Sequence, residues 1–99
     1  MLFRSAALAS CFSEDCRFFD YCPSQNGGSD SYVYGSACME MYYRSLWAAG
    51  NPVIAEPVIE NENRASIFIS YGGPYVYARI SIEEYDADGL IKKAIVHPA

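Results

Sequence analysis

Asp20 is the residue best placed to do chemistry, because it closes a short stretch of aromatic residues and cysteines. Residues 16–22 favour a strand, in which alternate side chains share a face. Asp20 should therefore lie beside Phe18, Cys16 and Cys22. A carboxylate in such surroundings loses hydration, which raises its pKa and makes it a candidate general base or polar group of a pocket. The alternative is a strand-end carboxylate that accepts hydrogen bonds from backbone amides of the next loop.

A second group of candidate residues stands on the segment that begins at Ser36 and ends near residue 49. Ser36 is a suitable N-cap, and the Gly-Asn-Pro triplet at residues 50–52 is suited to stopping a helix. Tyr42, Tyr43 and Trp47 lie on this predicted helix. Aromatic residues at helical spacing either line a pocket or belong to the core, and the sequence leaves both interpretations open.

The cysteines do not form a pattern typical of a metal site. They stand at positions 11, 16, 22 and 38, there is no Cys-x-x-Cys, and His97 is the one histidine. Zinc sites usually draw four nitrogen or sulfur ligands from paired short spacings, so we predict no metal and no cofactor. Residues 8–11 resemble a lipoprotein cleavage box, but the apolar run before them is too short for an export signal. We therefore expect buried free thiols and a cytoplasmic protein.

The predicted order is a helix, two strands joined by a loop, a second helix and then a run of strands, in a single domain over residues 1–99. A helix is predicted over residues 2–12, an acidic turn over 13–15, a strand over 16–22, a loop over 23–31 and a short strand over 32–34. After the second helix, strands are predicted at residues 53–60, 65–71, 75–85 and 90–97. Prolines in the first of these indicate an edge strand or a bulge. This order indicates an α+β fold with a mostly antiparallel sheet.

Three local motifs, in this order, resemble those of the NTF2-like superfamily, which includes the SnoaL-like polyketide cyclases and the ketosteroid isomerases. Phe-Ser-Glu-Asp at residues 12–15 resembles the motif before the first strand of that family. Gly-Ser-Ala-Cys-Met at 35–39 resembles its second helix start, and the segment 85–91 resembles its closing hairpin. The resemblance implies a cone, in which a strongly curved sheet wraps helices around a pocket. This chain lacks the residues for the first long helix of the family.

The resemblance also implies roles for single residues. Asp20 falls on the position of the general base of the isomerases, and Ser81 on that of an oxyanion donor, where the family carries an acid. Tyr43 lies where isomerases carry a tyrosine, so it is a second candidate donor. The polar side chains of residues 79–83 alternate with isoleucines, and we expect the polar face at the pocket mouth, although hydrophobicity favours the isoleucines. The predicted pocket-lining residues are Phe18, Cys22, Tyr42, Trp47, Phe68, Arg79 and Glu83.

Three functions remain open on this evidence. The leading hypothesis is a small-molecule-binding module with an apolar pocket that contains one carboxylate. The alternatives are an isomerase, cyclase or lyase with Asp20 as base, and an assembly protein whose pocket is filled by its own or a partner chain. The formal charge of −5 and the lack of a basic run exclude nucleic acid and anionic membranes as expected partners. Cone surface left uncovered by the missing helix predicts a homo-oligomer, most simply a dimer.

Overall fold

The computed structural model describes residues 4–99, apart from the side chain of residue 26. Residues 2 and 3, which belong to the first predicted helix, lie outside the described residues. The elements, in order, are α1 (Arg4–Ala9), β1 (Phe12–Asp20), the short 3-10 helix η1 (Pro23–Asn26), β2 (Ser31–Tyr34), α2 (Ser36–Ala48), β3 (Val53–Asn61), β4 (Arg64–Ser70), β5 (Val76–Tyr85) and β6 (Ile91–Pro98).

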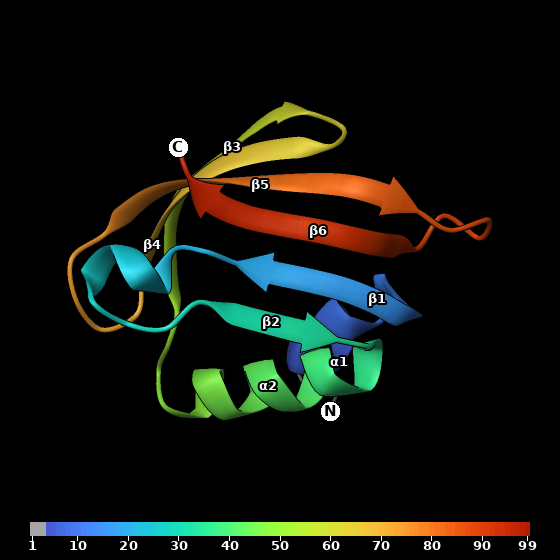
Figure 1. Ribbon diagram of the computed structural model, residues 1–99, viewed down its shortest axis with the longest axis horizontal. Coiled ribbons are helices and arrows are strands. Elements are labelled where there is room, and N and C mark those ends of the chain that lie inside the picture. The colour runs from blue at the N-terminus through green and yellow to red at the C-terminus, as the bar shows by residue number, and fades with distance from the viewer. Residues whose placement is uncertain (1–3) are drawn as a thin grey trace.

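All six strands belong to one sheet in the order β2-β1-β6-β5-β4-β3. The neighbours β1 and β6 are parallel, and every other neighbouring pair is antiparallel. The sheet is strongly curved, and both helices lie on its inner face (Figure 1). The predicted α+β class and the mostly antiparallel sheet are therefore confirmed.

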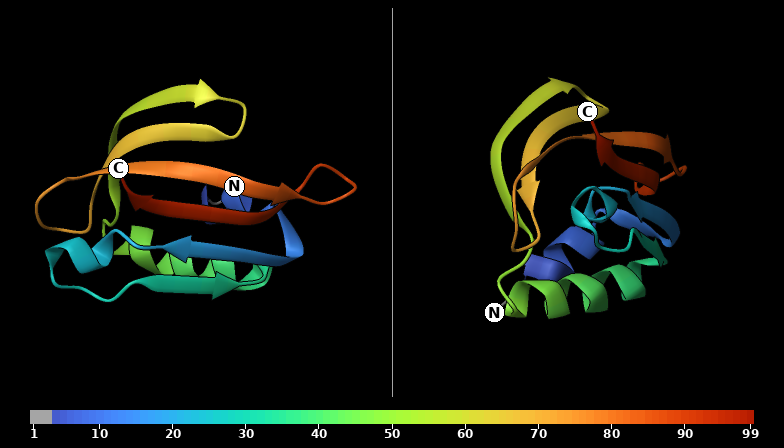
Figure 2. Two further views of the ribbon diagram at one scale, coloured as in Figure 1. Left: turned by 45° about the horizontal axis from the view of Figure 1, so that its top comes forward. Right: turned by 60° about the vertical axis from the view of Figure 1, so that its left-hand side comes forward.

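The helices cover only one half of the sheet. The two helices pack against each other, and α2 packs against β1 and β2. Figure 2 shows the β3–β4 hairpin rising away from both helices. We call β2, β1 and β6 the covered half of the sheet and β3, β4 and β5 the open half.

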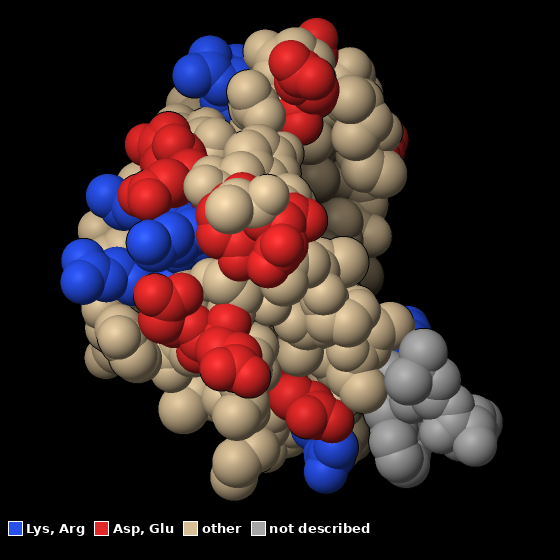
Figure 3. Space-filling model, turned by 90° about the vertical axis from the view of Figure 1, so that its right-hand side faces the viewer, with Lys and Arg blue, Asp and Glu red and all other residues tan. Residues whose placement is uncertain are grey.

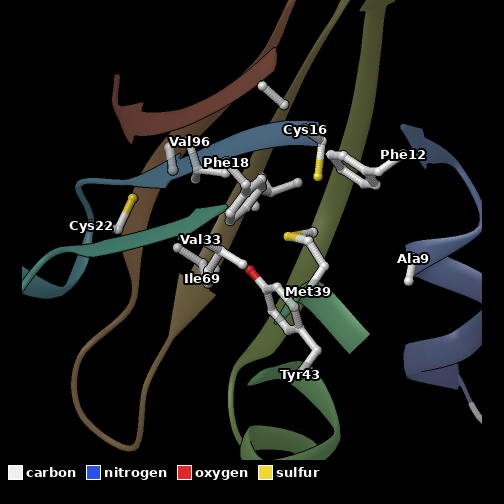
Figure 4. Close-up of a cluster of buried hydrophobic side chains, with 13 residues drawn as sticks. Ala9, Phe12, Cys16, Phe18, Cys22, Val33, Met39, Tyr43, Ile69 and Val96 are labelled. Carbon is white, nitrogen blue, oxygen red and sulfur yellow. The ribbon is translucent and has the colours of Figure 1, made fainter. Parts of the chain in front are cut away.

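The core lies between the helices and the inner face of the sheet, and it extends from the covered half to Ile67 and Ile69 of β4 and Ala78 of β5. Phe18 of β1 and Met39 and Tyr43 of α2 are buried and point toward one another (Figure 4). Their rings and side chains interdigitate, and the Phe18 and Tyr43 rings meet edge to face with centroids 5.9 Å apart. The alternation predicted for residues 16–22 explains this arrangement, because Cys16, Phe18 and Asp20 are all buried on the inner side of β1.

The first strand begins earlier than predicted, so the predicted acidic turn over residues 13–15 is wrong. β1 starts at Phe12, which pairs with Ile91 of β6, and the register shifts between Phe12 and Arg17. The parallel partner strand keeps the backbone extended, while Glu14 and Asp15 remain exposed. A pairing between residues so distant in the chain leaves no local signal.

Two predictions for the second half of the chain, the edge strand with a bulge and the hairpin at residues 85–91, are confirmed. β3 is an edge strand, and its pairing with β4 shifts register between Ala55 and Val58, next to Pro57. In the predicted β5–β6 hairpin turn, the backbone N–H groups of Asp88 and Leu90 both donate to Oδ1 of Asp86, at 2.9 Å.

Candidate functional site

The inner face of the sheet encloses an apolar cavity of about 300 Å³. Its walls come from both helices, from the segment before β3 and from five of the six strands. The lining residues are Leu8, Cys11, Phe12, Phe18, Asp20, Tyr43, Trp47, Pro52, Ile54, Ile67, Ile69, Ile80, Ile82, Ile91, Ala94 and Val96. Asp20 is the only ionisable carboxyl group among them.

A second cleft, of about 360 Å³, has a different character. It is lined by Asp15, Arg17, Tyr34, Glu84, Lys92 and Lys93. Lys92 and Glu84 are close enough for an ion pair, with Nζ and Oε2 3.8 Å apart. Figure 3 shows basic and acidic side chains gathered together on one side of the molecule, whereas the recess on the other side is lined by uncharged atoms. The charged cleft is exposed polar surface, so the apolar cavity is the stronger candidate for a ligand site.

Asp20 stands at the end of β1, where it is held between two neighbouring strands. It pairs with Ser31 of β2 and Val96 of β6, and it is only 2% exposed. Its Oδ1 accepts a hydrogen bond from the backbone N–H of Cys22, 3.0 Å away. Burial raises the pKa of the Asp20 carboxyl, and the hydrogen bonds from the backbone and thiol of Cys22 oppose this increase.

Asp20 has a contact expected of a loop-capping residue and also the position expected of a polar group in a pocket. The carboxyl group caps a backbone amide of the following loop, and it also forms part of the cavity wall. Its proposed role as a base stays a prediction.

Tyr43 and Trp47 enter the same cavity from one face of α2. Their rings lie 5.3 Å apart, centroid to centroid. Burial raises the pKa of the Tyr43 hydroxyl, and the negative charge of Asp20 adds to the increase. Within residues 4–99 we find no hydrogen bond from this hydroxyl. Tyr43 is thus a neutral phenol that can donate to a molecule in the cavity.

Cys22 and Tyr42 lie outside the cavity wall. Cys22 is fully buried beneath Asp20, and burial together with the Asp20 carboxylate raises the pKa of the Cys22 thiol to about 12. The Tyr42 hydroxyl is hydrogen-bonded to Oγ of Ser31 on β2. Both residues support the site rather than face it, since Cys22 holds Asp20 and Tyr42 ties α2 to the sheet.

The expectation that the polar face of β5 lines the pocket is corrected by the structure. Ile80 and Ile82 line the cavity and pair with Val96 and Ala94, which line it too. Ser81 therefore points to the outer face of the sheet. The pairing with β6 is regular up to Ile82 and shifts only beyond it, so no bulge turns Ser81 inward.

The other outward residues follow from the same alternation. Arg79 lies on the outer face and forms an ion pair with Glu60, with Nε and Oε1 2.8 Å apart. Glu83 is exposed at the register shift. Phe68 lies opposite Tyr77 on the outer face, with ring centroids 5.0 Å apart. Ser81, Arg79, Glu83 and Phe68 therefore do not line the cavity.

Six isoleucines of the cavity wall were not among the predicted pocket-lining residues. Ile54, Ile67, Ile69, Ile80, Ile82 and Ile91 come from β3, β4, β5 and β6. A signal was present for Ile80 and Ile82, which alternate with Arg79, Ser81 and Glu83, as is typical of a strand with one buried face.

Residues 4–99 contain no cluster of three or more side chains that could hold a metal ion. All four cysteines are free thiols, with Cys16 and Cys22 buried and Cys11 and Cys38 exposed. The expectation of buried thiols is therefore right for only two of them. In the same part of the chain, no helix has the length and apolar character needed to cross a membrane.

Comparison with known proteins defines the fold but no family. No protein-family model and no curated protein sequence matches this chain. A protein of unknown function with a cystatin-like fold from Methylobium petroleophilum is similar over 97% of this chain, with 20% identity and a TM-score of 0.62. The chain spans 65% of the length of that protein.

Two further solved structures are similar. One is a de novo designed protein with a curved β-sheet, at 13% identity and a TM-score of 0.59, covering 99% of this chain and 74% of the designed one. The other is a domain of unknown function with a cystatin-like fold from Nostoc punctiforme, at 12% identity and a TM-score of 0.51. It covers 92% of this chain and 62% of that one. At these identities the similarity shows the fold alone.

The prediction of an NTF2-like, SnoaL-like protein with an NTF2-like cone is therefore wrong. The fold is α+β and similar to the cystatin-like proteins. Local conformation explains the motifs that suggested the other family. Gly35 and Gly89 have φ angles of 91° and 80°, which only glycine adopts easily, and residues 12–15 lie inside β1.

Proposed function

We propose that this protein binds a small, neutral, mainly apolar molecule in the inner cavity, and that Asp20 and Tyr43 hold its polar group. The observation that carries the proposal is a carboxyl group, 2% exposed, in the wall of an otherwise apolar cavity. Cavities of this size with few polar groups are the usual form of small-molecule sites.

The hydrogen bond that Asp20 makes with the following loop does not require a carboxyl group. Its one backbone hydrogen bond, from Cys22, uses a single side-chain oxygen, which asparagine also supplies. A buried carboxyl group without full compensation costs stability. A ligand hydroxyl that donates to Asp20 and accepts from Tyr43 would satisfy both side chains.

Binding is better supported than catalysis. An isomerase, cyclase or lyase would need donors for a developing oxyanion, and Ser81 points to the outer face. Tyr43 is the remaining candidate, and loss of one such donor costs about 2.7–4 kcal/mol of transition-state stabilisation. The assembly alternative, with the pocket filled, is less favoured because the cavity has space for a ligand.

The test uses Trp47, the single tryptophan of the chain, which lines the cavity and reports on its contents. Neutral alcohols and ketones are titrated into the protein while Trp47 emission is followed. We expect saturable binding that the Tyr43→Phe substitution weakens by about 0.5–1.5 kcal/mol, the usual net value of one hydrogen bond. Tyr42→Phe is the matched control, because the neighbouring hydroxyl is bonded to Ser31 outside the cavity. Equal losses in the two variants, or no saturable signal, would contradict the proposal.

We also propose a homodimer formed through the outer face of the sheet. That face exposes two aromatic pairs, Phe19 with Tyr32 and Phe68 with Tyr77, with ring centroids 4.6 Å and 5.0 Å apart. Tyr32 and Tyr77 are about half exposed, and the two pairs lie on either side of β6. Exposed aromatic side chains of this kind are typical of protein interfaces. Sedimentation equilibrium of the wild type and of Tyr77→Lys tests this. A monomeric wild type at high protein concentration would refute it.

A cytoplasmic location remains part of the proposal. Four free thiols fit a reducing compartment. Thiol titration of the unfolded protein, isolated from its own cells under conditions that block oxidation, is expected to find all four.

A further inference from the structure

The inner cavity adjoins a groove on the open half of the sheet, and the two have Ile80 and Ile82 in common. The groove, of about 180 Å³, is lined by Ile59, Ala65, Ile80, Ile82 and the turn at residues 61–64. Ile80 and Ile82 also line the cavity. The two spaces therefore lie side by side along β5, and a ligand longer than the cavity has the groove as its nearest apolar surface.

The isoleucines and Ala65 form the apolar part of the groove, and the turn at residues 61–64, which includes Glu62 and Arg64, forms its polar end. Ile59 is the most exposed large apolar residue of the described chain, at 75%. It pairs with Ala65 on the inner side of the β3–β4 hairpin, which stands away from both helices (Figure 2). Exposed isoleucine next to a cavity gains free energy when an apolar chain covers it.

The polar end of the cavity restricts the ligand chemistry. Burial raises the pKa of the Asp20 carboxyl, and the phenol of Tyr43 is neutral, so this end suits an uncharged group. An anionic head group would meet the Asp20 carboxyl as a like charge or would itself have to be protonated. A hydroxyl group can donate to Asp20 and accept from Tyr43 at the same time.

We propose that the ligand class is elongated alcohols, with the hydroxyl at Asp20 and Tyr43 and the alkyl chain passing over Ile80 and Ile82 to Ile59. This inference rests on the proposed function and adds the length and direction of the ligand. It makes the groove part of the binding site rather than a surface for another protein.

The experiment measures Trp47 emission in titrations with octanol, decanol, dodecanol and tetradecanol, each below its solubility limit. Each buried methylene contributes about 0.8 kcal/mol, which corresponds to a roughly fourfold lower Kd. We expect the wild-type affinity to keep increasing beyond octanol. Ile59→Ser is expected to weaken dodecanol binding by about fourfold or more and to leave octanol binding unchanged.

Val58→Ser is the matched control. Val58 is the neighbouring exposed residue of β3, but it pairs with Ser66 and so faces the outer side of the sheet. This variant should bind every alcohol as the wild type does. Because Ile59 and Val58 are both exposed, both variants are expected to fold.

The outcomes separate this inference from the proposed function. If no alcohol binds, the proposed function fails and the inference fails with it. If octanol binds but longer chains gain nothing, or if Ile59→Ser leaves dodecanol binding unchanged, the cavity binds ligand and the groove does not. If Ile59→Ser converts a dimer to a monomer without altering the affinities for alcohols, the groove is an interface between copies, and the inference is overturned.

Discussion

The covered and open halves of the sheet show how the same alternating pattern produces a core in one place and a binding surface in another. In the covered half, the inward residues of β1, such as Phe18, meet Met39 and Tyr43 of α2 and are buried. In the open half, Ile67 and Ile69 of β4 are buried as well, but the inward residues of the edge strand β3, Ile54 and Ile59, are 50% and 75% exposed. Both halves carry apolar inner faces, so the difference comes from the helices and not from the strands.

The exposure of the apolar side chains of β3 is therefore a property of the fold rather than of the local sequence. The main contacts of the helices are those between α1 and α2 and those of α2 with β1 and β2, at the end of the sheet opposite β3. Apolar residues that would form a core elsewhere are thus left facing a cavity and a groove. Such surfaces on folded proteins usually serve for binding.

The largest loss of unfolding free energy is expected when a core side chain of the covered half is truncated. Met39→Ala removes a fully buried side chain and should lower the free energy of unfolding by about 2–5 kcal/mol. Ile59→Ala in the open half should cost less than about 0.5 kcal/mol, because its side chain is already exposed. Urea unfolding at a fixed, low protein concentration measures both. Comparable losses would mean that the open half is covered in solution, and the comparison would be broken.

A smaller change in the free energy of unfolding is expected from a substitution at Asp20, which lies in the cavity wall. Asp20→Asn keeps the oxygen that accepts from Cys22 and removes the buried carboxyl, so we expect a gain of about 1 kcal/mol in unfolding free energy at neutral pH. Thermal unfolding at matched protein concentration measures it. Lower stability of the Asn variant would show that Asp20 serves the loop alone.

The pH dependence of this gain has a defined sign. The pKa of Asp20 is raised in the folded state, so the folded protein binds more protons than the unfolded chain once the pH exceeds the ordinary aspartate pKa of about 3.9. Wild-type stability from this group is therefore complete below that pKa and declines as the pH increases through the folded pKa. The advantage of Asp20→Asn should shrink as the pH falls toward 3.9 and below, in unfolding curves recorded across that window.

The sequence predicted much of the local structure. The second helix, the three strands after β3, the bulged edge strand and the β5–β6 hairpin follow from periodicity, from prolines and from turn residues. The placement of Asp20 beside Phe18 follows from alternation alone. The motifs at Gly35 and Gly89 reflect the positive φ angles that their turns require. This local requirement explains why they resembled the NTF2-like motifs, although the fold is similar to cystatin-like proteins.

Sequence by itself thus determined the element order and which residues share a face of each strand, because those properties depend on neighbours along the chain. Only the tertiary structure decided which face of β5 looks inward, since that depends on the pairing of Ile80 with Val96 and of Ile82 with Ala94. It also decided the length of β1, through the parallel pairing with β6. The exposure of Ile59 was likewise decided there, because whether a helix packs over a strand depends on the tertiary arrangement and not on the neighbours of that residue along the chain.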